Sequence, residues 1–86
     1  MFAVYLSSDA ERFLKKSPKD LRERIIKKIK NLAEDPFPSD SKRIIGRDEK
    51  VFRIRVGDYR VQYVVFYDKK EVLVSDIDKR ERAYPD

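Results

Sequence analysis

The chain contains no cysteine and no histidine among its 86 residues. Without cysteine it forms neither disulfides nor a thiolate nucleophile. Without histidine it lacks the side chain that most often serves acid–base catalysis and transition-metal binding. Any catalysis would therefore depend on Tyr, Lys, Arg, Asp or Glu. We expect neither a metal ion nor another cofactor.

Long hydrophobic runs are also absent. The apolar segment at residues 2–6 is too short for the core of a signal peptide. No stretch approaches the roughly 18 apolar residues that a membrane-spanning helix needs. We therefore expect a cytoplasmic protein that does not associate with membranes. A chain of this length accommodates one modest core, so residues 1–86 are expected to form a single domain.

Charged residues, in contrast, make up 43% of the sequence, and Lys and Arg outnumber Asp and Glu by 21 to 16. The net charge of +5 favours partners that carry phosphate or acidic groups. Between positions 42 and 60 there are seven basic and three acidic residues, so much of the excess lies in this segment. This segment is the first candidate for a polyanion-binding surface.

Hydrophobic spacing predicts a strand at residues 2–6 followed by two helices. Ser8 and Glu11 have the spacing of a capping box for a helix over residues 9–16. Ser17 would cap a second helix that starts at Pro18. Apolar residues recur in this second helix at helical intervals: Leu21, Ile25, Ile29 and Leu32. Prolines at positions 36 and 38 would end it.

The second half of the chain predicts strands over residues 51–56, 59–67 and 71–77, with a short strand or turn near residue 42. We therefore expect an α+β fold in which a helical hairpin covers one face of a four-stranded antiparallel or mixed sheet. The sequence does not determine which edge the first strand joins. Tyr59, Tyr63 and Tyr67 share a side with apolar residues, so we expect them in the core.

The hairpin over residues 51–63 carries the most informative pattern. With a two-residue turn at positions 57 and 58, Arg55 lies opposite Arg60 and Arg53 lies opposite Gln62. Like charges directly opposite one another destabilise a sheet by roughly 0.2–1 kcal/mol. A polyanion would relieve this repulsion. We expect these four side chains on the face that the helices leave uncovered.

A structural role is the alternative for the same arginines. Arg55 and Arg60 could pair with Asp76, Asp78 or Glu81 and serve only to stabilise the sheet.

These residue types also suit RNA chemistry. Guanidinium groups donate two hydrogen bonds to a phosphate and keep their charge, and a tyrosine stacks on a base or transfers a proton. Without a metal, RNA cleavage would proceed by attack of the 2′-hydroxyl on the adjacent phosphorus. Fixed positive charge would stabilise the resulting oxyanion.

The chain resembles RelE-type toxins of the RelE/ParE superfamily over essentially all of its 86 residues. The resemblance rests on the opening strand, the helical hairpin ending in Asp-Pro-Phe, the basic stretch from residue 42 to 47, the sequence FRIRVGDYRVQY over residues 52–63 and the terminal KRERAY over 79–84. It implies the toxin of a type II toxin–antitoxin system. Such a toxin would cleave mRNA in the ribosomal decoding site and be neutralised by a cognate RelB-like antitoxin.

The resemblance also implies roles for individual residues. Arg60 would stabilise the phosphate in the transition state. Arg80 would assist the leaving oxygen or bind phosphate, and Tyr84 would orient or deprotonate the attacking hydroxyl or stack on a base. Six further cations would hold the RNA and the ribosome: Lys42, Arg43, Arg47, Arg53, Arg55 and Lys79.

Two other functions remain open at this point. A ParE-like toxin would inhibit DNA gyrase without cutting RNA, and the helical hairpin and the tail would dominate that contact. The third function is that of a small basic RNA-binding module without catalysis.

Overall fold

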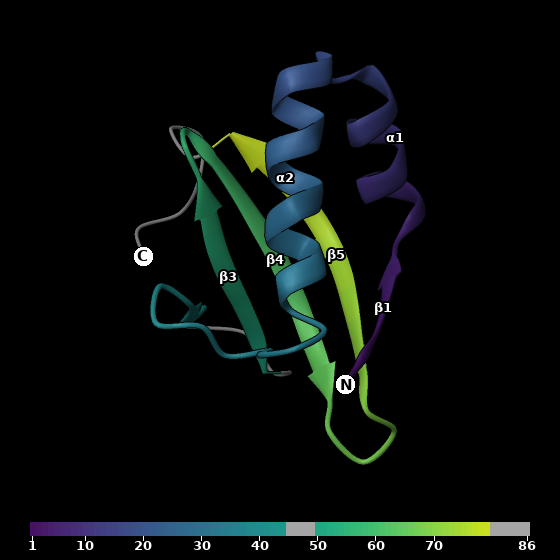
Figure 1. Ribbon diagram of the computed structural model, residues 1–86, viewed down its shortest axis with the longest axis vertical. Coiled ribbons are helices and arrows are strands. Elements are labelled where there is room, and N and C mark those ends of the chain that lie inside the picture. Colours follow the sequence, from purple (N-terminus) through teal and green to yellow (C-terminus); the bar gives the residue numbers. More distant parts are fainter. Residues whose placement is uncertain (45–49, 80–86) are drawn as a thin grey trace.

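The computed structural model describes residues 1–44 and 50–79. This part of the chain forms seven elements: β1 (Ala3–Leu6), α1 (Ser8–Lys16), α2 (Lys19–Asn31), β2 (Lys42–Arg43), β3 (Val51–Val56), β4 (Tyr59–Phe66) and β5 (Glu71–Lys79). The strands build one sheet in the order β1-β5-β4-β3-β2, and both of these helices lie on one face of it (Figure 1). The predicted α+β class and the helical hairpin on one face are confirmed.

The sheet is mixed and has five strands in the described residues, one more than predicted. The additional strand is β2, whose two residues pair antiparallel with β3. β1 pairs parallel with β5, which answers the question that the sequence left open. A parallel pair needs a long crossover connection when its strands are adjacent in sequence. Here the two strands are separated by the rest of the fold, and β4 lies at the centre of the sheet.

Both predicted helix caps differ from the observed ones. Ser7, rather than Ser8, precedes α1, and its Oγ accepts a hydrogen bond from the backbone nitrogen of Ala10 at 3.1 Å. The same hydroxyl donates to the carbonyl of Ser75 at 2.9 Å, so contact with β5 selects this serine. Ser17 does not cap α2, because its hydroxyl donates back to the carbonyl of Phe13 at 2.7 Å.

The core lies between the helices and one face of the sheet. Three of the four predicted positions of the second helix are buried in it, and the fourth, Leu21, is partly buried against it. The buried core residues are Ala10, Leu14, Ile25, Ile29, Leu32, Ile54, Val56, Val61, Tyr63, Val72, Val74 and Ile77. Tyr63 is fully buried and Tyr59 is half-buried. The prediction for Tyr67 is wrong, because this residue follows the end of β4 and is 62% exposed.

Candidate functional site

The face of the sheet away from α1 and α2 carries the predicted arginines. Residues directly opposite one another in an antiparallel ladder point to the same face. The register therefore gives two rows of side chains across the sheet. The first row is Lys42, Arg53, Gln62 and Asp76, and the second is Arg55, Arg60 and Asp78. We call these seven residues the arginine face.

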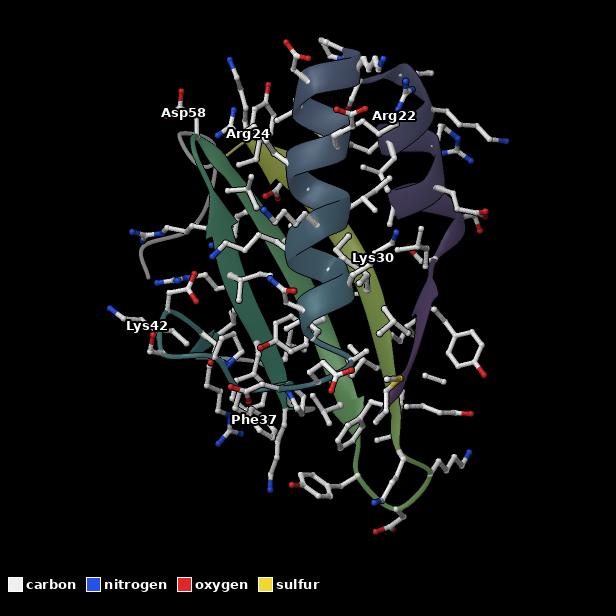
Figure 2. The ribbon with its side chains drawn as sticks, viewed as in Figure 1. Arg22, Arg24, Lys30, Phe37, Lys42 and Asp58 are labelled. Carbon is white, nitrogen blue, oxygen red and sulfur yellow. The ribbon has the colours of Figure 1, made fainter. Side chains whose placement is uncertain are left out.

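The predicted hairpin register is confirmed. Arg55 lies opposite Arg60 and Arg53 lies opposite Gln62. The turn begins at Gly57, whose φ of 59° is in the left-handed region that glycine adopts readily. A side chain at this position would also meet Arg24 of α2, since a Cβ there would lie 2.8 Å from its Nη2. Figure 2 shows Arg24 and Asp58 close together at this end of the molecule.

Three of the seven side chains of the arginine face are much more buried than predicted. Arg60 is 1% exposed, and Arg53 and Gln62 are each 3% exposed. A guanidinium group stays charged in a protein, so burial leaves its charge in a poorly hydrated environment. Such a charge interacts more strongly with a bound anion than a solvated one does. These side chains do lie on the face that α1 and α2 leave uncovered, as predicted, but Arg53, Arg60 and Gln62 are not exposed to solvent there.

Arg60 lies near a carboxylate of β5. Its Nε is 3.7 Å from Oδ1 of Asp78, which lies directly opposite in the ladder. Burial raises the pKa of Asp78 above its ordinary value; the positive charge of Arg60 opposes this effect and the negative charge of Asp76 adds to it. The pairing of Arg60 with Asp78 that the structural alternative expected is thus present at ion-pair distance.

The loop between α2 and β2 is tied to the sheet at two points. The hydroxyl of Tyr63 donates to the carbonyl of Pro36 at 2.7 Å, and Nη1 of Arg53 donates to the carbonyl of Asp40 at 3.1 Å. Asp40 also accepts a hydrogen bond from Nζ of Lys28 at 2.8 Å, which lowers the pKa of its carboxyl. These contacts fix the chain immediately before β2 and so position the end of the first row.

The remaining predicted site residues lie elsewhere. Arg43 is opposite Phe52, and Lys79 is opposite Tyr59, so the register places both on the side of the sheet that faces the helices. Arg47, Arg80 and Tyr84 lie outside the described residues. The structure thus brings together four of the predicted cations, and it adds two aspartates to them.

From the sequence alone, these aspartates, Asp76 and Asp78, are expected only as pairing partners for the arginines. Their spacing of two residues on a strand was a signal that they share a face. Within residues 1–44 and 50–79 no group of three or more Asp or Glu side chains could hold a metal ion. No helix in the same part of the chain is long and apolar enough to cross a membrane.

Comparison with known proteins identifies the family. Residues 4–84 match the family model of the ParE toxin of type II toxin–antitoxin systems, parDE. The chain belongs to the RelE/ParE toxin family. It is 43% identical over 76 residues to RelE1, a proposed toxin of Methanocaldococcus jannaschii, and the match covers 80% of this chain and 83% of that protein. The resemblance to RelE-type toxins is therefore confirmed.

Solved structures of RelE toxins have the same fold. The archaeal RelE–RelB complex from Pyrococcus horikoshii is similar with a TM-score of 0.83 and 27% identity, over 95% of this chain and 98% of that chain. The isolated RelE toxin of Escherichia coli is similar with a TM-score of 0.80 and 25% identity, over 96% and 88% of the two chains. This RelE-type chain is thus a toxin of the type II toxin–antitoxin class.

Proposed function

We propose that this RelE-type toxin is a metal-independent endoribonuclease that cleaves mRNA in the ribosomal decoding site and so inhibits translation. The observation that supports it most directly is the buried guanidinium of Arg60, flanked by the other cations of the arginine face. Cleavage by the 2′-hydroxyl builds negative charge on the oxygens of the phosphate. Charges that are already fixed and desolvated stabilise that state without reorganisation.

The position of each residue suggests its role in the reaction. Arg60 would contact the scissile phosphate, and Lys42, Arg53 and Arg55 would hold the neighbouring phosphates. Arg80 and Tyr84 keep the roles that the family resemblance implies, at the leaving oxygen and at the attacking hydroxyl. The reaction would take place in the cytoplasm, where ribosomes and mRNA meet.

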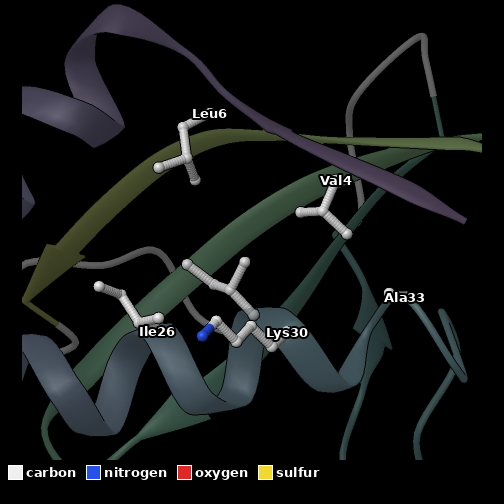
Figure 3. Close-up of a pocket in the computed structure, with 6 residues that line it drawn as sticks. Val4, Leu6, Ile26, Lys30 and Ala33 are labelled. Atoms are coloured by element: carbon white, nitrogen blue, oxygen red, sulfur yellow. The ribbon is translucent and has the colours of Figure 1, made fainter.

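We also propose a cognate RelB-like antitoxin as the partner of this toxin. The P. horikoshii relative was solved as a complex of RelE with RelB. In this chain an apolar groove of about 310 Å³ lies between β1 and α2, lined by Val4, Leu6, Ile26, Ile29, Lys30 and Ala33 (Figure 3). An apolar segment of a partner would bury these side chains, and an acidic segment would neutralise the arginine face.

Primer extension on a defined mRNA bound to 70S ribosomes tests the nuclease. We expect cuts that require both the ribosome and Arg60, with Arg60→Ala slowing cleavage by about 100-fold or more. Arg12→Ala is the matched control, because it removes the same charge from the exposed surface of α1. An intact message with the wild-type toxin would exclude this function.

The match to the ParE family model favours one other candidate, a toxin that inhibits DNA gyrase without cutting RNA. In that case a supercoiling assay would show inhibition by the wild-type protein, and toxicity would survive Arg60→Ala. Loss of toxicity in Arg60→Ala together with normal gyrase activity would exclude it.

A further inference from the structure

The arginine face contains two carboxylates, both on β5, and they differ in how their oxygens are engaged. Oδ1 of Asp76 accepts a hydrogen bond from the backbone nitrogen of Ile77 at 2.9 Å. Oδ1 of Asp78 accepts none from the residues that the structure describes. Its distance of 3.7 Å from Nε of Arg60 is beyond the usual range for a hydrogen bond, about 2.7–3.2 Å. This oxygen is buried against Arg60, so a substrate hydroxyl could reach only the other oxygen of the carboxylate.

Asp78 is also the more accessible member of its pair. Its side chain is 36% exposed, whereas that of Arg60 is 1% exposed. Asp78 thus lies beside Arg60 and is the nearer of the two to solvent. In RNA the 2′-oxygen and the scissile phosphate are attached to neighbouring carbons of one ribose. A base that serves this hydroxyl must consequently lie beside the group that binds the phosphate, as Asp78 does.

We propose that Asp78 is the general base of the cleavage reaction, which removes the proton from the attacking 2′-hydroxyl. The inference rests on the endoribonuclease function proposed above and adds to it the group that activates the nucleophile. A carboxylate is a suitable candidate because the chain has no histidine, and tyrosine and lysine are ordinarily protonated at neutral pH.

The cleavage of one phosphodiester begins with a proton transfer. A carboxylate oxygen of Asp78 takes the 2′-proton while the 2′-oxygen bonds to phosphorus. The bond from phosphorus to the 5′-oxygen breaks, and this oxygen takes a proton from water. The products are a 2′,3′-cyclic phosphate and a 5′-hydroxyl, and Asp78 returns its proton to the resulting hydroxide. Nothing is oxidised or reduced.

The charged groups that face Asp78 favour this role. Burial raises the pKa of this carboxyl, the positive charge of Arg60 on β4 opposes that effect, and the negative charge of Asp76 adds to it; Arg55 on β3 lies beyond Arg60 in the same row. The pKa of Asp78 is raised on balance, which makes the carboxylate a stronger base than an aspartate in water.

Single-turnover cleavage of ribosome-bound mRNA at several pH values tests the proposal. We expect Asp78→Asn to slow cleavage by about 100-fold to 10,000-fold. Without its base the variant would depend on hydroxide, so the logarithm of its rate would rise with pH with a slope of one. The wild-type rate would instead depend little on pH over the neutral and alkaline range. Asp78→Glu would restore part of the rate.

The control is Asp68→Asn, which removes the same charge from the exposed turn between β4 and β5 and should cleave at the wild-type rate. The affinity of Asp78→Asn for ribosomes should equal that of the wild type, whereas its melting temperature should be lower, because the carboxylate also offsets the charge of Arg60. A purely structural role would lower the melting temperature and leave the slope unchanged, and that result would overturn the proposal.

Two other outcomes would also overturn it. If Asp78→Asn cleaves within threefold of the wild type, the carboxylate is not the base. If Tyr84→Phe acquires the hydroxide dependence and Asp78→Asn does not, the base is the tyrosine. Failure of the underlying function is recognised separately, because then the wild-type toxin itself would leave the mRNA intact, and the assignment of Asp78 would fall with it.

Discussion

Tyr63 links the centre of the sheet to the loop that precedes β2, and its replacement gives a measurable test of this link. The ring is fully buried, and its hydroxyl donates to the carbonyl of Pro36, itself a buried residue, at 2.7 Å. Tyr63→Phe deletes this bond and leaves the carbonyl without that donor. We expect the free energy of unfolding to decrease by about 1–2 kcal/mol at neutral pH. For a domain of this size that corresponds to a decrease in melting temperature of about 5–10 °C.

The same substitution should have the opposite effect in alkali. Burial raises the pKa of Tyr63 from 10.0 to about 12. Between these pH values the unfolded chain releases the phenolic proton while the folded chain keeps it, so folding loses stability as pH rises. The difference in pKa corresponds to about 2.7 kcal/mol at most. Phenylalanine cannot ionise, so the variant escapes this loss.

Urea denaturation followed by circular dichroism, at neutral pH and in steps above pH 10, measures both effects. The variant should be less stable at neutral pH, and its deficit should shrink and then reverse in alkali. Tyr67→Phe is the matched control, because that tyrosine is 62% exposed, and its stability should follow the wild type throughout. A deficit that stays constant across the pH range would refute the reasoning.

Further substitutions test three local features by thermal or urea unfolding. Ser7→Ala should lower the free energy of unfolding by about 1 kcal/mol and Ser8→Ala by less than about 0.5 kcal/mol, because only Ser7 is the observed cap. Equal losses in the two variants would contradict this assignment. Gly57→Ala should lower the free energy of unfolding by about 1–3 kcal/mol, because φ is positive and the new Cβ would clash with Arg24. Adding Arg24→Ala should remove the clash but not the strain of the positive φ. Asp40→Asn should cost less than about 1 kcal/mol, since the pair with its lysine is exposed. Because that lysine lowers the carboxyl pKa, the difference should exist above the ordinary value of 3.8 and disappear as pH falls further.

Local patterns predicted the β3–β4 hairpin correctly because one short turn determines its register. Two residues separate Val56 from Tyr59, so the positions of Arg55 and Arg60 follow from counting. The helix cap could not be obtained in the same way. Ser7 and Ser8 both suit an N-cap, and what separates them is a hydrogen bond to Ser75, which is 68 residues away. The local pattern likewise could not predict that Arg53 and Arg60 are buried, because charged residues on a strand are usually exposed.

The register of β5 shows where counting along the sequence fails. Near the turn, Tyr63 lies opposite Val74, and this spacing would place Arg60 opposite Ile77. The ladder is interrupted between Gln62 and Tyr63, and Ser75 is the extra residue on β5, so Arg60 lies opposite Asp78 instead. A shift of one residue exchanges the two faces of a strand. Without the bulge, the two aspartates of β5 would point into the core.

This bulge therefore connects the stability of the fold with its proposed chemistry. In the two rows of the arginine face, cations outnumber carboxylates by four to two. Arginines opposite one another repel, and burial makes that repulsion more costly than it would be in water. Asp76 and Asp78 offset part of this cost in the free protein. A bound phosphate would add to this compensation. The same carboxylate that makes the buried arginine tolerable then lies where a 2′-hydroxyl would need a base.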